Sequence, residues 1–105
     1  MSLLSIEKKT ENDLIRNYLK QTKMNRVWTS GTDLEEEGSF IWLSTGKVLN
    51  FTYWAASQPD NARSIEHCLE INRYLGSNYT WNDIPCTETH NFVCEILECS
   101  PFCNL

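Results

Sequence analysis

The sequence lacks any cluster of lysine or arginine residues. Its 9 basic residues are scattered from Lys8 to Arg73, and 14 acidic residues outnumber them, which gives a formal net charge of -5. Nucleic-acid-binding surfaces concentrate basic side chains so that they can contact phosphates. The composition therefore argues against a nucleic-acid partner. The sequence also contains no apolar run of the length that a bilayer span requires, so we expect no segment that crosses a membrane.

Residue patterns that are typical of catalysis are also lacking. The two histidines, His67 and His90, do not lie beside a serine or cysteine in a recognisable motif, so a nucleophilic triad has no support. Carboxylates occur in pairs, but nothing in the sequence indicates that one of them has a raised pKa suited to acid catalysis. We therefore expect that the protein is not an enzyme.

No internal repeat, low-complexity segment or linker interrupts the 105 residues. With 41% hydrophobic residues, and four residues each of tryptophan, tyrosine and phenylalanine, the chain can bury one modest core. We expect one domain over residues 1–98, followed by a cysteine-containing tail over residues 99–105.

Five cysteines in so small a chain indicate an oxidising compartment, yet residues 1–6 do not form a secretory signal. The odd count means that at least one thiol stays free, pairs between chains or has lost its partner. We interpret this as an extracellular, secreted protein with N-terminal sequence missing. In a secreted chain the sequons Asn50-Phe51-Thr52 and Asn78-Tyr79-Thr80 make Asn50 and Asn78 candidate glycosylation sites.

One helix and several short strands are predicted. Over residues 10–20, Leu14, Ile15, Tyr18 and Leu19 recur at helical spacing, and Thr10 with Asp13 could form a capping box. The predicted strands, which are short and aromatic or β-branched, form small antiparallel sheets. They cover residues 2–6, 26–29, 39–43, 68–72, 79–81 and 91–95. This pattern predicts an α+β fold in which residues 51–65 form a long loop, and such loops are usually functional.

Oxygen-bearing side chains gather in that loop and just after it. The five that concern us are Gln58, Asp60, Glu66, Asn82 and Asp83. Calcium binds carboxylate and amide oxygens together, so this set predicts a Ca²⁺ site. The alternative is that these residues are turn formers and caps.

A series of motifs in the same order and spacing resembles the C-type lectin-like domain over roughly residues 2–97. The motifs are Ser5-Ile6-Glu7, Val27-Trp28, Glu37-Gly38-Ser39-Phe40-Ile41-Trp42, Tyr53-Trp54, Gln58-Pro59-Asp60, Glu66-His67-Cys68, Trp81-Asn82-Asp83, Cys86 and Phe92-Val93-Cys94-Glu95. The resemblance implies an α+β domain with a long calcium-binding loop that is held by a disulfide between Cys68 and Cys86.

The family's domain begins with a strand and a helix that precede the first residues here, and this helix carries the cysteine that bonds to the counterpart of Cys94. The resemblance thus implies a chain that is truncated at its N-terminus, with Cys94 lacking its usual partner. Cys99 and Cys103 could bond to each other, or one of them to Cys94. A zinc site made by His90 with Cys94, Cys99 and Cys103 is the alternative, but the spacing fits no common pattern.

The resemblance also implies a function. In members that bind sugar, the peptide before the proline is cis, so that Gln58 and Asp60 would both direct oxygens at the ion. Calcium takes about six to eight oxygens, which leaves room for two vicinal sugar hydroxyls. The order Gln-Pro-Asp resembles galactose-type members, which favours galactose or N-acetylgalactosamine.

One feature common in galactose binders, an aromatic residue that stacks on the sugar, is absent from residues 61–65. Tyr53 and Tyr79 are possible substitutes, although residues of their type in strands more often pack in the core. Trp81 is expected to lie in the core while its neighbours Asn82 and Asp83 face the ion.

A second, weaker calcium site is predicted from Asp33, Glu37 and Asn61. Asn61 and His67 stand where the family's auxiliary site usually has carboxylates, which should weaken binding. The alternative is a solvated acidic loop formed by Asp33 and residues 35–37.

Three readings of function follow. The first is a calcium-dependent lectin whose partners are glycans or glycoproteins. The second is a calcium-independent, lectin-like module that binds protein through another surface. The third is a truncated, non-functional domain.

Overall fold

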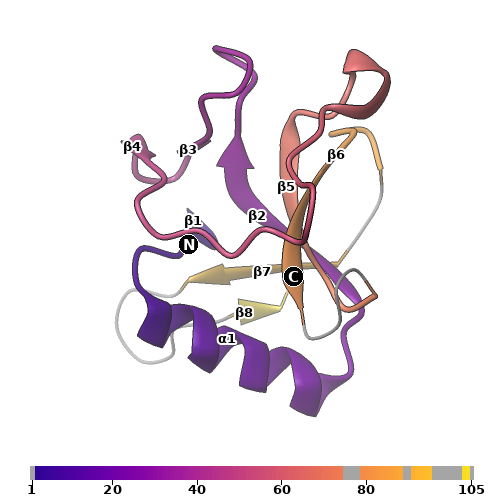
Figure 1. Ribbon diagram of the computed structural model, residues 1–105. Coiled ribbons are helices and arrows are strands. Elements are labelled where there is room, and N and C mark those ends of the chain that lie inside the picture. The colour runs from indigo at the N-terminus through magenta and orange to yellow at the C-terminus, as the bar shows by residue number, and fades with distance from the viewer. Residues whose placement is uncertain (1, 75–78, 89–90, 96–102, 105) are drawn as a thin grey trace.

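We describe a computed structural model of the protein, which covers residues 2–74, 79–88, 91–95 and 103–104. Within these residues the chain forms one α-helix, a short 3₁₀ helix and eight strands, an α+β arrangement (Figure 1). The helix lies on one side of the sheet, and two long loops extend from the opposite end of the molecule (Figure 1). The predicted α+β fold is therefore confirmed.

Helix α1 (Lys9–Thr22) is amphipathic, but it differs in detail from the prediction. Its buried residues are Asn12, Ile15 and Leu19, whereas Leu14, predicted on the apolar face, is 53% exposed. The predicted capping box of Thr10 and Asp13 is wrong, because the helix begins one residue before Thr10. Instead, the Glu11 carboxylate accepts a hydrogen bond of 3.0 Å from the backbone N–H of Glu7.

The central strands are β2 (Arg26–Thr32), β5 (Cys68–Asn72) and β6 (Thr80–Ile84), with β5 antiparallel to both neighbours. Strand β7 (Asn91–Glu95) runs parallel to β2, a pairing that the sequence pattern did not predict. Four two-residue strands complete the sheet, namely β1 (Ser2–Leu3), β3 (Ile41–Trp42), β4 (Lys47–Val48) and β8 (Cys103–Asn104).

Four of the six predicted strands have different bounds in the structure, and the strand predicted over residues 39–43 is confined to Ile41–Trp42. The first strand ends at Leu3 rather than residue 6, although Leu4 and Ile6 are fully buried. Strand β2 extends three residues beyond its predicted end, and β6 begins at Thr80 and continues to Ile84. The extension of β6 places Asn82 and Asp83 on a strand of the sheet rather than in a loop, so their side chains are held by strand pairing with β5.

An aromatic cluster joins the sheet to the loop over residues 49–61. Trp81, fully buried on β6, makes edge contacts with Trp42, Phe51 and Trp54 at ring-centroid distances of 5.5, 5.9 and 6.0 Å. Its backbone carbonyl accepts from Ala55 N–H, at 2.8 Å. The prediction that Trp81 packs in the core is confirmed. Through these contacts the loop that carries Gln58 and Asp60 is fixed against the strand that carries Asn82 and Asp83.

A disulfide joins Cys68, at the start of β5, to Cys86, just after β6, with the two Cα atoms 5.1 Å apart. This is the pair that the family resemblance implied. The bond encloses a separation of 18 residues, and on the loop-entropy description such a cross-link contributes about 3 kcal/mol. It ties together the two strands that flank the candidate site.

Most of the predicted tail lies outside the described residues. Cys99 and His90, two residues of the zinc alternative, also lie outside the described residues, as does the candidate glycosylation site Asn78. Strand β8 pairs antiparallel with β7 and places the backbone of Cys103 opposite that of Cys94. The other candidate glycosylation site, Asn50, is exposed on the surface.

Candidate functional site

Three carboxylates from the loop and the sheet converge at one point. Asp60, Glu66 and Asp83 each offer an oxygen, and these oxygens lie within 4.8 Å of one another. Asp83, 1% exposed on β6, accepts hydrogen bonds from the backbone N–H groups of Asp60 at 3.1 Å and Asn61 at 2.7 Å. The Asp83 carboxylate thus holds the loop backbone against β6, and the carboxylates of Asp60 and Glu66 lie beside it.

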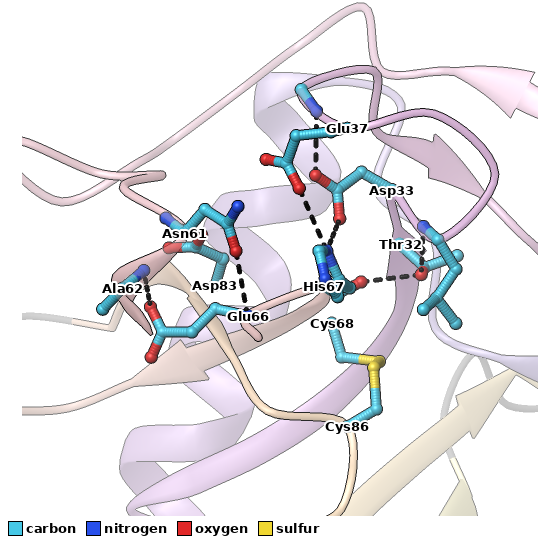
Figure 2. A network of polar contacts seen from close by, with 12 residues as sticks. Thr32, Asp33, Glu37, Asn61, Ala62, Glu66, His67, Cys68, Asp83 and Cys86 are labelled. Carbon is cyan, nitrogen blue, oxygen red and sulfur yellow. Dashed lines mark hydrogen bonds and ion pairs between the residues drawn. A yellow bond between two sulfur atoms is a disulfide. The ribbon is translucent and has the colours of Figure 1, made fainter. Parts of the chain in front are cut away.

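The loop segment around the 3₁₀ helix η1 (Ala62–Ser64) folds back on itself (Figure 2). The Glu66 carboxylate accepts from the N–H of Ala62 at 3.1 Å, and the N–H of Glu66 donates to the side-chain oxygen of Asn61, also at 3.1 Å. These two bonds return the chain so that Glu66 lies beside Asp60, six positions earlier in sequence. The peptide between Gln58 and Pro59 is cis.

Two amide oxygens on residues that lie within two positions of Asp60 or Asp83 in sequence have no hydrogen-bond partner among the described residues. They are Oε1 of Gln58 and Oδ1 of Asn82, and both atoms are buried. Buried polar atoms are nearly always paired, so an unpaired acceptor requires a cause such as an ion or a water. These oxygens belong to two of the five predicted ligands, and the other three are the converging carboxylates. The donor set is therefore all oxygen, which is the set that a hard divalent cation prefers.

Burial and, to a smaller extent, the crowding of negative charge raise the pKa of one carboxyl group in the site. Burial raises the pKa of Glu66 to about 7, and the neighbouring Asp60 and Asp83 add to this effect, while the Ala62 N–H opposes it. No pattern in the sequence indicates this raised pKa, because the shift depends on burial and on contacts between residues that are distant in sequence. A carboxyl group with a raised pKa, such as that of Glu66, is stabilised either by a proton or by a nearby cation.

A second group contains Asp33, Glu37 and His67. His67 Nδ1 lies 3.0 Å from Asp33 Oδ1 and 3.2 Å from Glu37 Oε1, and Asp33 also accepts from the Gly38 N–H at 2.9 Å. Figure 2 shows that the neighbours Glu66 and His67 point to different groups. Asn61, predicted as a ligand of this second site, instead contacts Glu66 and Asp83.

The alternative of a solvated acidic loop describes part of this region. Glu35, Glu36 and Glu37 are exposed, whereas Asp33 is 2% exposed and fully used in hydrogen bonds. Desolvation, together with the charge of Asp33 and a hydrogen bond with it, raises the pKa of Glu37, and His67 opposes this shift. The imidazole of His67 occupies the position between the two carboxylates.

The proposed stacking residues lie elsewhere. Tyr79 is 4% exposed, and its hydroxyl donates to the carbonyl of Leu19, so it is a core residue and the suggestion that it stacks on a sugar was wrong. Tyr53 is half-buried, with the guanidinium of Arg16 5.0 Å from the centre of its ring. The guanidinium therefore covers one face of the Tyr53 ring.

Sequence reasoning missed one residue of the site's support, Glu70 on β5. It is completely buried and accepts hydrogen bonds from Arg26, Asn72 and Asn82. The signal that could have found it is the charged residue between Leu69 and Ile71 in an otherwise apolar strand, since buried carboxylates occur only with partners.

Comparison with known proteins agrees with this geometry. The Lectin C-type domain family matches residues 2–96, and the chain belongs to this family. Several of the relatives are named as lectins, which are not enzymes, in agreement with the expectation that the protein is not an enzyme. Within the described residues, no helix is long and apolar enough to cross a membrane.

Among its relatives, the chain is 42% identical to Perlucin of Haliotis laevigata over 94 residues, which cover 89% of this chain and 59% of Perlucin. It is 36% identical to the alpha-N-acetylgalactosamine-specific lectin of Patiria pectinifera, over a region that covers 90% of this chain and 56% of that lectin. Among solved structures, the C-type lectin CEL-I of Cucumaria echinata superposes with a TM-score of 0.75 at 27% identity. The superposed region covers 86% of this chain and 64% of CEL-I. The chain thus spans less than two thirds of each of these proteins.

Proposed function

We propose that this protein is a calcium-dependent lectin that binds glycans through Gln58, Asp60, Glu66, Asn82 and Asp83. The observation that carries the proposal is the convergence of three carboxylates, together with buried, unpartnered amide oxygens on Gln58 and Asn82, which lie within two positions of Asp60 and Asp83 in sequence. A divalent cation at this point would satisfy both oxygens and neutralise the crowded charges. A set of turn formers and caps, the alternative reading, would leave both amide oxygens unsatisfied.

The chain's own residues would hold the ligand as follows. The ion, when bound, supplies positive charge that attracts the lone pairs of two neighbouring sugar hydroxyls. Asp60 and Glu66 accept hydrogen bonds from those hydroxyls, and the NH₂ group of Gln58 can donate a hydrogen bond to one of the hydroxyl oxygens. Glu66 must lose its proton before it can fill this role, whereas Asp83 stays engaged with the loop backbone.

Galactose and N-acetylgalactosamine are the sugars that we propose. The order Gln-Pro-Asp at residues 58–60 supports this preference, as does the likeness to a lectin whose name specifies N-acetylgalactosamine. The disulfide supports an extracellular, secreted location, where the exposed Asn50 could carry a glycan.

A column experiment tests this proposal. The protein should be retained on immobilised N-acetylgalactosamine in calcium and released by a chelator or by free galactose, while a mannose column retains much less. Retention in the presence of chelator would contradict a calcium-dependent mechanism. Equal retention on mannose would contradict the sugar preference alone.

Calcium affinity should depend on pH between 8 and 6. Calcium must displace the proton of Glu66, so we expect the affinity to be nearly constant above pH 8 and to fall toward tenfold per pH unit below about 7. The stability of the calcium-free protein has the opposite pH dependence. The raised pKa means that this group stabilises the fold fully at low pH, and the contribution is lost as the pH rises through about 7.

Calorimetric titrations with calcium at pH 8, 7 and 6 measure this dependence. The matched control is His67→Gln, which removes an imidazole that belongs to the second group and not to the one that contains Glu66. The pH dependence should survive in the control. An affinity that is the same at pH 8 and pH 6, or a dependence that disappears with His67→Gln, would contradict the role of Glu66.

The second candidate function is a lectin-like module that binds protein without calcium. It is favoured by the absence of an aromatic residue from 61–65, by the burial of Tyr79 and by the histidine in the second group. This reading predicts that a partner remains bound when calcium is removed.

A further inference from the structure

Glu70 is a buried carboxylate in direct contact with one of the proposed ligands. It lies on β5 opposite Asn82 on β6, and the Asn82 NH₂ group donates to its Oε2 at 3.0 Å. Arg26 donates to both carboxylate oxygens, at 2.8 and 3.1 Å, and Asn72 donates to Oε2 at 3.0 Å. The side chain of Glu70 has no exposed surface.

These contacts fix which end of the Asn82 amide faces Glu70. Both oxygens of Glu70 accept from donors, the Arg26 guanidinium and the NH₂ groups of Asn72 and Asn82, and a carboxylate held in this way accepts hydrogen bonds and does not donate them. The NH₂ end of the amide must therefore face Glu70. The oxygen is then directed away from Glu70, and this is the atom that is buried without a partner.

We propose that Glu70 is a positioning residue that sets the Asn82 amide with its oxygen available to the cation. This inference rests on the proposed function. Without Glu70 the amide could rotate by half a turn and present its NH₂ group to the cation, which would repel it. Glu70 itself contacts neither the ion nor the sugar, and acts only through Asn82.

The first test is Glu70→Gln, which keeps the size of the side chain. A glutamine can offer either an oxygen or an NH₂ group to Asn82, so the orientation is no longer imposed. We expect calcium affinity to fall about 10- to 100-fold, the range seen when groups behind metal ligands are changed. The matched control is Asn72→Ala, which removes another partner of the same oxygen and should leave calcium affinity within about threefold, the usual context-dependent spread.

The decisive test is a double-mutant cycle with Asn82→Asp. An aspartate has an oxygen at each end, so its orientation does not matter. In the Glu70→Gln background, Asn82→Asp should restore calcium affinity, because the introduced glutamine can donate to one oxygen and leave the other for the ion. In the natural background the same change sets two carboxylates against each other and should not improve affinity. An improvement of equal size in both backgrounds would reflect added charge alone and would overturn the proposal.

A measurement without calcium separates this inference from the proposed function. In the calcium-free protein, NMR should show Asn82 side-chain NH₂ protons that exchange slowly, and Glu70→Gln should change their shifts. The exposed Asn50 amide gives the reference for fast exchange. Fast exchange at Asn82 would overturn the inference even if calcium binds. If the natural chain binds no calcium, the proposed function fails and Glu70 has no role in cation binding, whatever the amide orientation.

Discussion

Asp60→Ala should reduce calcium affinity by at least about a hundredfold and abolish retention on N-acetylgalactosamine. The reason is that Asp60 is one of three converging carboxylates and is proposed to contact both the ion and a sugar hydroxyl. Loss of a direct ligand should cost more than loss of a supporting residue, which typically costs 10- to 100-fold. The side chain of Asp60 is exposed, so the substitution should leave the fold intact. Calorimetry with calcium measures the effect directly.

Glu35→Ala is the matched control for this prediction. It removes the same charge from an exposed position in the acidic loop over residues 33–38, and Glu35 belongs to neither carboxylate group. Calcium affinity should then change by less than about threefold, because exposed charges are screened by salt. If Asp60→Ala and Glu35→Ala behave alike, the five proposed ligands do not form the cation site. An unchanged interaction with the natural partner in Asp60→Ala would favour the protein-binding module.

Trp81→Ala should be the most destabilising single substitution that we predict, at about 3–5 kcal/mol. Trp81 is fully buried, contacts three aromatic rings and donates a hydrogen bond from its indole N–H to Asn12 at 3.2 Å. Domains of this kind have a total stability of about 5–15 kcal/mol, so much of the fold's margin would be lost. Urea unfolding at saturating calcium measures the change in free energy of unfolding.

The comparison for Trp81→Ala is Leu14→Ala on α1. Leu14 is also a large apolar residue, but it is 53% exposed, so its removal should cost less than about 0.5 kcal/mol. If both substitutions cost the same, Trp81 does not lie in a packed core. If Trp81→Phe, which leaves Asn12 without the indole donor, costs as little as Leu14→Ala, the hydrogen bond to Asn12 contributes nothing to stability.

The parts of the fold that could be predicted from sequence were those with a local signature. Helical spacing predicted α1 to within two residues at each end. The Gln-Pro-Asp, Glu-His-Cys and Trp-Asn-Asp motifs contain the three carboxylates that the structure brings together, Asp60, Glu66 and Asp83. The disulfide pair followed from the resemblance rather than from spacing, because five cysteines allow many pairings.

The parts that could not be predicted depend on contacts between distant segments. Leu14 fits the helical period as well as Ile15 does, and only packing against the sheet decides which of them is buried. The raised pKa of Glu66 arises mainly from its burial, with contributions from Asp60 and Asp83, and Tyr79 donates in the core to the carbonyl of Leu19, which is 60 positions away in sequence. Glu70 has a role only once β5 and β6 are paired in register, which no local pattern specifies.

The central claim is that the folded chain binds calcium, and thermal unfolding with excess calcium or with a chelator tests it most directly. A ligand that binds only the folded state adds about 2.7 kcal/mol at a hundredfold excess over its Kd, which corresponds to roughly 10–20 °C in a domain of this size. We predict one cooperative transition that calcium raises by that order and that Asp60→Ala no longer shifts. A cooperative transition at the same temperature in calcium and in chelator would contradict the claim, and the absence of any transition would favour the reading of a truncated, non-functional domain.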